Sequence, residues 1–357
     1  MAVYTTIDDP SAHFQATIYS GTGSTASVTN GGNSDLQPDF VWIKCRTGNA
    51  RDNRLLDSTR GVQKELVSNS TAAEYTEATG FTAFQSDGFQ HGGANGYGAS
   101  DETYVAWQWK ANGGTRSTFT ESGANPGGGY QANTTGGVSI VDYTGTGAAG
   151  TMAHGLGAAP GVIIVKRRDD ASSWIVYHRG NTSAPETDIL ELQANNATYD
   201  NSTYWNDTAP TSSVFTINTS SDGNADAATY VAYCFAEIQG YSKFGSYTGN
   251  GNADGPFIYL GFKPAWVVIK RTDSTNNWGI FDSTRDTFNQ VGKQLYANGT
   301  EAEDADAAHS SGRDYLSNGF KLRETGNAIN GSDATYIYMA FAEHPFVSSD
   351  GVPCTAR

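Results

Sequence analysis

Two short acidic turns carry the sharpest chemical motif in this chain of 357 residues. The segments "LLDSTRG" and "IFDSTRD" each place an aspartate three residues before an arginine, as Asp57 with Arg60 and Asp282 with Arg285. Such an aspartate can accept hydrogen bonds from a tight turn and pair with the guanidinium. We interpret both as structural turn pairs, with a ligand site as the alternative. Catalysis is disfavoured because no second carboxylate, histidine or nucleophile recurs beside them.

Metal and cofactor chemistry has little support in the residue spacing. The six histidines lie far apart, and none has the spacing of a zinc motif. Two oxygen-rich turns, "DGNAD" (222–226) and "NADG" (252–255), contain residue types that Ca²⁺ prefers, but neither has the spacing of a twelve-residue calcium loop. Cys45, Cys234 and Cys354 are too far apart for a disulfide framework or a zinc site. We expect no cofactor and no metal, with Ca²⁺ as the open alternative.

Two loops combine aromatic rings with polar groups in a way that suits a sugar. An exposed ring packs on sugar C–H groups, while amide and carboxylate oxygens bond the hydroxyls. The polar loop "NSTYWNDTAP" has no counterpart elsewhere in the chain, and "QHGGANGYGASD" is a second, weaker case. The alternative is that these rings anchor their own loops. The candidate glycan-binding residues are Tyr199, Tyr204, Trp205, Asn206, Asp207, His91 and Tyr97.

The elements that would position these residues recur along the chain. A Gly-rich turn after a tyrosine, then a proline, then an apolar β-branched and aromatic run ending in lysine occurs three times. The lysines are Lys44, Lys166 and Lys270, and a "TY" strand follows each of them near the end of its copy. These landmarks keep step with a period of about 105 residues, which is the size of a domain and too long for one turn of a solenoid.

Each copy offers many short strand-like runs and no convincing amphipathic helix. Such a pattern favours a two-sheet antiparallel sandwich, with a jelly roll as the preferred variant. The predicted fold is therefore all-β, with three tandem antiparallel β-sandwich modules. The predicted boundaries are module 1 with a polar lead-in at 1–112, a linker or long packed loop at 113–136, module 2 at 137–240, module 3 at 241–347 and a C-terminal tail at 348–357.

Charge and hydropathy narrow the class of partner. The formal net charge of −15 argues against nucleic acid, because such binding relies on a basic patch. Nowhere do 18 consecutive apolar residues occur, so no membrane insertion is expected. The N-terminal segment has no basic stretch followed by an apolar one, so no signal peptide is expected and assembly in a cytoplasm is predicted.

The repeated phrases resemble a known family. "DLQPDFVWIK", "LLDSTRG", "TYVAWQWKA" and "GYSKFGSYTGNGNADGPFIYLGFKPAWVVIKRTD" are similar to the tandem lectin-like modules of tail-fibre and other virion surface proteins from marine bacteriophages. The resemblance covers residues 4 to 346. It implies a virion structural protein at the virion surface, in contact with other virion proteins and forming a homo-oligomer. By analogy with fibres in general, that oligomer would be a trimer.

The functional expectation is therefore a non-enzymatic tail fibre or fibre-like appendage that adheres to host surface polysaccharide. Linked modules suit adhesion because several weak glycan contacts gain avidity when joined. The first alternative is a purely structural virion component, such as a head decoration or tail scaffold protein, with no glycan binding. The second is a glycan depolymerase, which would need a pair of carboxylates in a cleft.

Overall fold

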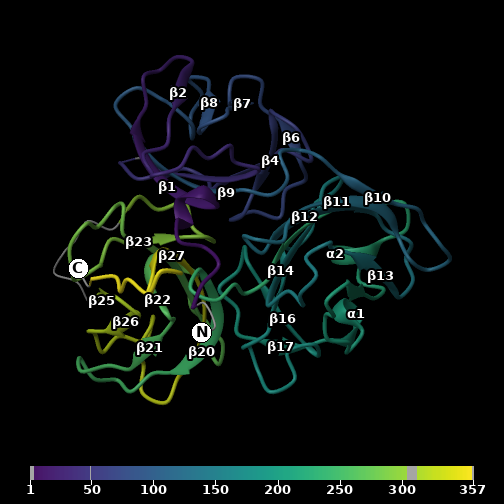
Figure 1. The fold of residues 1–357 in the computed structure, drawn as a ribbon. Coiled ribbons are helices and arrows are strands. Elements are labelled where there is room, and N and C mark those ends of the chain that lie inside the picture. Colours follow the sequence, from purple (N-terminus) through teal and green to yellow (C-terminus); the bar gives the residue numbers. More distant parts are fainter. Residues whose placement is uncertain (1–3, 49, 304–311, 356–357) are drawn as a thin grey trace.

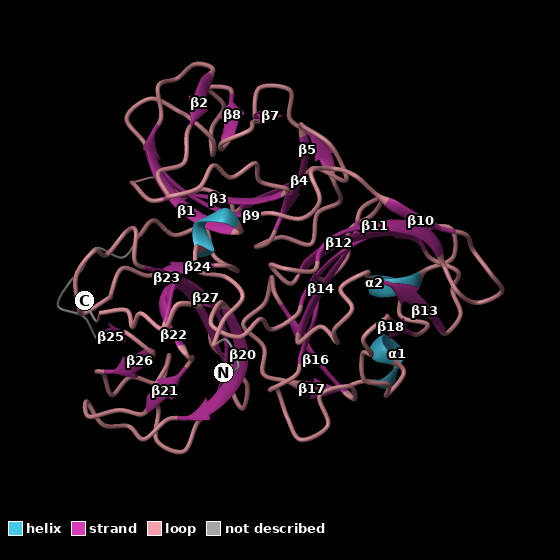
Figure 2. Ribbon diagram, in the orientation of Figure 1, coloured by secondary structure: helices cyan, strands magenta, loops and turns pink. Residues whose placement is uncertain are grey.

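The computed structural model of the chain describes residues 4–48, 50–303 and 312–355 and is built from antiparallel β-sheets. Figure 1 shows three lobes around a common centre, following the chain from purple through teal to yellow. Within the described residues the helices are short (Figure 2): η1 (Pro10–Ala12), α1 (Ser202–Trp205) and α2 (Ser221–Asn224). None of the described helices is long and apolar enough to cross a membrane. The predicted all-β class is confirmed.

Each lobe contains one large and one small sheet, and we call the lobes repeat 1, repeat 2 and repeat 3. The large sheet of repeat 1 has the strand order β1 (Phe14–Ser20), β9 (Thr103–Trp109), β3 (Phe40–Cys45), β4 (Arg54–Asp57), β5 (Lys64–Val67) and β6 (Tyr75–Thr76). Its small sheet has the order β2 (Ala26–Val28), β8 (Phe89–His91) and β7 (Phe81–Phe84).

The other two repeats follow the same order. In repeat 2 the large sheet runs β12 (Val138–Thr144), β19 (Thr229–Phe235), β14 (Val162–Arg167), β15 (Ile175–His178), β16 (Asp188–Glu191) and β17 (Tyr199–Asp200), and the small sheet pairs β13 (Gly150–Ala153) with β18 (Val214–Ile217). In repeat 3 the large sheet runs β20 (Ser242–Thr248), β27 (Thr335–Pro345), β22 (Phe262–Arg271), β23 (Gly279–Asp282) and β24 (Leu295–Tyr296), and the small sheet β21 (Phe257–Tyr259), β26 (Gly319–Leu322) and β25 (Arg313–Leu316).

The apolar runs are continuous because the central strands of each large sheet are buried on both faces. In β3, Val41 and Ile43 point toward the small sheet and join a core with Phe81 of β7. Phe40 and Trp42 alternate with them and point toward the other two repeats. Successive side chains of a strand face opposite ways, so a strand covered on both sides needs apolar residues at every position.

The three repeats share one central core. It takes Trp109 from repeat 1, Phe235 from repeat 2 and both Trp266 and Phe341 from repeat 3. The Trp109 ring lies edge-on to Trp266 at 5.3 Å and to Phe341 at 5.7 Å between ring centroids. Aromatic pairs favour such edge-to-face arrangements. The repeats are therefore fixed against one another by a buried aromatic cluster as well as by the chain.

The segment predicted as a linker or long packed loop, 113–136, contains two strands. β10 (Ser117–Phe119) pairs with β11 (Gly127–Asn133), and β11 pairs with β12 over seven residues. These strands extend the large sheet of repeat 2 to eight strands. Phe119 and Tyr130 pack against the core of that repeat. The period-2 apolar signal is absent here because the strand pairing of β11 depends on glycine and polar residues.

Candidate functional site

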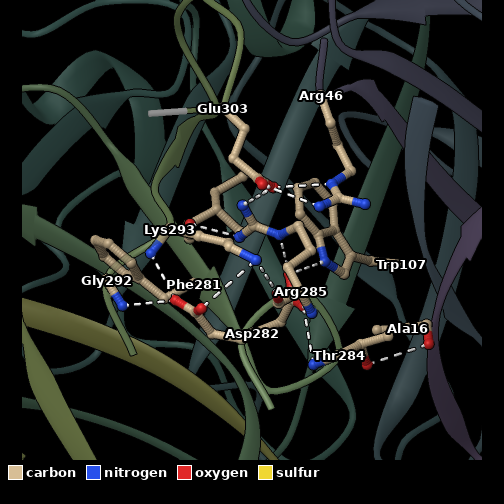
Figure 3. A network of polar contacts seen from close by, with 12 residues as sticks. Ala16, Arg46, Trp107, Phe281, Asp282, Thr284, Arg285, Gly292, Lys293 and Glu303 are labelled. Carbon is tan, nitrogen blue, oxygen red and sulfur yellow. Dashed lines mark hydrogen bonds and ion pairs between the residues drawn. The ribbon is translucent and has the colours of Figure 1, made fainter. Parts of the chain in front are cut away.

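The two Asp–Arg turns lie where one repeat meets the next. At the contact between repeats 1 and 3 (Figure 3), Arg285 donates from Nε to Oδ2 of Asp282 at 2.5 Å and from Nη1 to Glu303 at 3.1 Å. From the other repeat, Trp107 donates its indole N–H to Oδ2 of Asp282 at 3.0 Å, and Arg46 pairs with both oxygens of Glu303 at 2.9 Å. The turn therefore links the repeats in addition to closing itself.

The same network recurs at the contact between repeats 2 and 1. Arg60 donates to Asp57 at 2.5 Å and to Glu74 at 3.0 Å within repeat 1. From repeat 2, Tyr233 donates its hydroxyl proton to Oδ2 of Asp57 at 2.7 Å, and Arg168 pairs with Glu74 at 3.0 Å. Burial opposes ionisation of Glu74, but the hydrogen bonds and charges of both arginines lower its pKa.

The third contact, between repeats 3 and 2, replaces every charged member of the network by a neutral residue. His178 occupies the aspartate position, because it pairs across the sheet with Val162 as Asp57 pairs with Phe40. The neutral residues are His178, Asn181, Thr198 and Thr272. At the contact between repeats 2 and 1, the same four positions hold Asp57, Arg60, Glu74 and Arg168. At the contact between repeats 1 and 3, they hold Asp282, Arg285, Glu303 and Arg46.

The contacts of His178 explain why a neutral residue fits at the aspartate position. The residue of repeat 3 at the position that Trp107 and Tyr233 hold in the other repeats is Met339. It lines the same cavity as His178 and carries no donor. The N–H of Gly180 donates to Nδ1 of His178, so Nε2 carries the proton and donates to the carbonyl oxygen of Tyr338 at 3.0 Å. Burial lowers the pKa of His178 to about 4. A neutral imidazole donor thus takes over from a carboxylate acceptor.

Three buried lysines complete the ring of contacts. Lys44 donates to the carbonyl oxygen of Gly299 in repeat 3, and Lys166 donates to that of Thr71 in repeat 1, both at 3.0 Å. Lys270 donates to the carbonyl oxygen of Asn195 in repeat 2 at 3.3 Å. Burial lowers the pKa of each lysine to about 8. Repeat 1 donates to repeat 3, repeat 3 to repeat 2 and repeat 2 to repeat 1, so the three contacts close a cycle within one chain.

The loop predicted to bind a glycan is less exposed than its sequence suggests. Trp205 is 2% exposed, and its ring lies edge-on to Tyr177 at 6.0 Å between centroids. Tyr204 is also buried, and its hydroxyl donates to Asp222 at 3.1 Å. The expectation of an exposed indole face was wrong, because α1 turns these rings inward onto the core of repeat 2.

Of the other residues predicted to bind a glycan, some are exposed and some are buried. Asn206 and Asp207 are exposed beside the buried rings, and Tyr199 is half-buried. His91 and Tyr97 are both buried in the core of repeat 1, where Tyr97 donates its hydroxyl proton to Glu65. The structure therefore leaves polar groups at the Tyr199–Asp207 loop but no indole face for a sugar to stack on.

Exposed aromatic rings gather instead on β21 of repeat 3. Phe257 and Tyr259 are 44% and 47% exposed and lie on the same face of the strand, on either side of buried Ile258. Ile258 pairs with Phe320 as Val28 pairs with Phe89 in repeat 1 and Met152 with Phe215 in repeat 2. The residues at the two ring positions are therefore Ser27 and Thr29 in repeat 1, and Thr151 and Ala153 in repeat 2.

A hollow of about 380 Å³ opens beside Tyr259. Tyr4 contributes a hydroxyl 3.2 Å from that of Tyr259, and Lys243 lies over the Tyr259 ring at 5.1 Å and donates to its carbonyl oxygen at 2.8 Å. Glu237 and exposed Gln239 also line the hollow. Burial and the neighbouring Tyr259 hydroxyl raise the pKa of Tyr4, so the Tyr4 hydroxyl stays protonated.

The chemistry of this hollow is compatible with a neutral polyhydroxyl compound. Aromatic faces supply apolar contact, while amide, hydroxyl, ammonium and carboxylate groups offer donors and acceptors around one opening. Within the described ranges, no group of three or more histidine, cysteine, aspartate or glutamate side chains could hold a metal ion. No residue of this hollow is among the candidates predicted from the sequence; the alternation of two aromatic residues around Ile258 is the signal that could have identified it.

The comparisons with known proteins give a family and no further likeness. A family model described as a domain of unknown function (DUF7483) matches residues 9–345. No curated protein and no solved structure matches the chain.

Proposed function

The chain belongs to the DUF7483 family, a domain of unknown function, and from its structure we propose that it is a non-catalytic saccharide-binding protein of a virion surface. In this proposal each repeat is a β-sandwich module, and the three modules form a rigid support for the rings of β21. The resemblance of the repeated phrases to virion surface proteins supports the location. The exposed pair Phe257 and Tyr259 supports the binding activity.

The aromatic pair carries the proposal because it breaks the repeat pattern. The matching positions in repeats 1 and 2 hold only small side chains, so the rings are not needed to build the small sheet. Two aromatic side chains that remain nearly half exposed leave apolar area in water, which is unfavourable without a partner. Sugar rings, with apolar C–H faces and hydroxyls, fit both the rings and the surrounding polar groups.

The proposal excludes a lytic role for this site. Glu237, the carboxylate of the hollow, accepts hydrogen bonds from the N–H of Phe244 at 2.7 Å and from Arg179 at 2.8 Å. Glycoside hydrolysis uses a pair of carboxylates flanking the scissile bond. Among the residues that the structure describes, the lining of the hollow includes Glu237 and no second carboxylate.

A trimer of chains would need surfaces other than those between repeats. The faces that the three repeats present to the centre are buried within one chain. An oligomer, if formed with other virion proteins or with further copies, would therefore use the outer faces and strand edges. We propose that the chain meets the particle through such an outer surface and leaves β21 free.

The binding claim is tested by glycan-array binding and by retention on immobilised host-cell polysaccharide. The variant Phe257→Ala/Tyr259→Ala should lose at least tenfold in affinity while keeping its stability. Phe288→Ala, which removes a ring that is 81% exposed elsewhere in repeat 3, is the matched control and should bind normally.

The alternatives give distinct outcomes. Failure of the intact chain to bind any saccharide, together with immunogold labelling of phage particles, would support a purely structural virion component. Release of new reducing ends from the polysaccharide would identify a depolymerase. Equal binding by the double variant and the intact chain would refute the assignment to β21.

A further inference from the structure

The edge of β1 that faces away from β9 is equivalent to an edge in repeat 2 that another strand covers. β1 pairs with β9 in the same way that β12 pairs with β19, so the two are equivalent first strands. The other side of β12 pairs with β11. On that side of β1 the described residues contain no paired strand. One sheet edge is therefore extended within the chain, and its counterpart is not.

A groove of about 480 Å³ lies along this open edge, between repeats 1 and 3. One wall is β1, with Phe14, Ala16 and Ile18, and the other includes Ser283 and Thr284 of the second Asp–Arg turn. Ile18 is 44% exposed in it. The groove thus combines a strand edge, apolar side chains and two hydroxyls.

The equivalent place between repeats 2 and 1 is filled by β11. Ser58 and Thr59 follow Asp57 as Ser283 and Thr284 follow Asp282. Gln131 of β11 donates from its amide to the hydroxyl oxygens of Ser58 at 2.8 Å and Thr59 at 2.5 Å. At this equivalent contact, the place of the groove is therefore occupied by a β-strand of the chain itself.

The backbone of β1 is oriented to accept a further strand. The hydroxyl of Thr284 donates to the carbonyl oxygen of Ala16 at 3.3 Å, so that carbonyl faces the groove (Figure 3). In an antiparallel strand the N–H and C=O of one residue point to the same side, so the N–H of Ala16 faces the groove as well. Ile18, two residues further, has the same orientation.

We propose that this groove binds an extended, glycine-rich polypeptide strand of a partner protein, which pairs antiparallel with β1 as β11 pairs with β12. The partner strand would place an amide side chain near Ser283 and Thr284 and would replace the long Thr284–Ala16 hydrogen bond with backbone pairing. Main-chain hydrogen bonds supply affinity in this mode of recognition, and side-chain pockets supply selectivity.

The template also restricts the chemistry of the partner. A Cβ on Gly128 of β11 would lie 2.1 Å from the carbonyl oxygen of Asp142, so that position accepts only glycine. The chain carries a net charge of −15, so an acidic strand would be repelled. The partner strand is therefore neutral or basic, with glycine where the backbone approaches most closely. This inference does not depend on saccharide binding at β21.

The test uses a labelled peptide with the sequence of residues 125–135, NPGGGYQANTT, titrated with the full chain. Fluorescence anisotropy should show saturable binding, and hydrogen exchange should show new protection of the Ala16 and Ile18 amides. Ile18→Lys should weaken binding at least tenfold. Val62→Lys, the same change at a residue that is 40% exposed outside the groove, should bind like the intact chain.

Three results would overturn the proposal. The first is no saturable binding at millimolar peptide. The second is equal binding by Ile18→Lys, which would mean that the peptide displaces β11 from β12. The third is a concentration-dependent dimer of the chain that the peptide dissociates, which would make a second copy the occupant.

Discussion

Replacing Asp282 by asparagine tests whether the buried ion-pair network holds repeats 1 and 3 together. The side chains of Asp282 and Arg285 are fully buried, with Oδ2 and Nε 2.5 Å apart. Asparagine keeps the shape and can still accept from the indole of Trp107, but it removes the negative charge. Removing one partner of a buried ion pair leaves the other charge uncompensated and costs about 3–5 kcal/mol. Glu303 still pairs with Arg285, so we expect the lower end, about 3 kcal/mol.

The matched control is Asp169→Asn. Asp169 pairs with Arg167 at 3.1 Å, but its side chain is 40% exposed. Exposed pairs of this kind contribute about 0.2–1 kcal/mol. Urea-induced equilibrium unfolding followed by tryptophan fluorescence measures both free energies of unfolding, because Trp107, Trp109 and Trp266 lie in the shared core.

The equivalent turn makes the test sharper. Asp57→Asn should lower the free energy of unfolding by the same amount as Asp282→Asn, to within about 1 kcal/mol. Asp57 pairs with Arg60 of its own turn and accepts a hydrogen bond from Tyr233 of the neighbouring repeat. A loss below about 1 kcal/mol for both variants, equal to that of Asp169→Asn, would refute a stabilising role for the network.

Two further predictions concern His178 and Trp205. The pKa of His178 is lowered from 6.5 to about 4. As the pH falls below 6.5, His178 therefore becomes protonated in the unfolded chain while it stays neutral in the folded chain. Between pH 7 and pH 4.5 this residue should remove about 2 to 3 kcal/mol of stability, and urea unfolding of His178→Gln should show a smaller loss over that range. Trp205→Ala should lower the free energy of unfolding by about 3–5 kcal/mol, because it opens a cavity in the core of repeat 2, and should leave saccharide binding unchanged.

Each of these predictions has a contrary outcome. An identical pH dependence for His178→Gln and the intact chain would show that the imidazole is not held neutral. A Trp205→Ala variant of normal stability that no longer binds saccharide would return the site to the Tyr199–Asp207 loop.

The sequence by itself determined the all-β class and the threefold repeat. Both are local properties: strands of alternating and β-branched residues, turn residues between them, and landmarks such as Lys44, Lys166 and Lys270 recurring at a fixed period. It also indicated the Asp–Arg contact within each turn, since those residues are three positions apart.

Only the tertiary structure decided what each turn and each ring contacts. Asp282 accepts from Trp107 across 175 positions of sequence, and Asp57 from Tyr233 across 176, so no local pattern contains these partners. The inward rotation of Trp205 and the addition of β11 to β12 likewise follow from packing against distant strands. A period-2 pattern states which residues share a face of a strand, but the element that covers that face is fixed only when the three repeats close around one core.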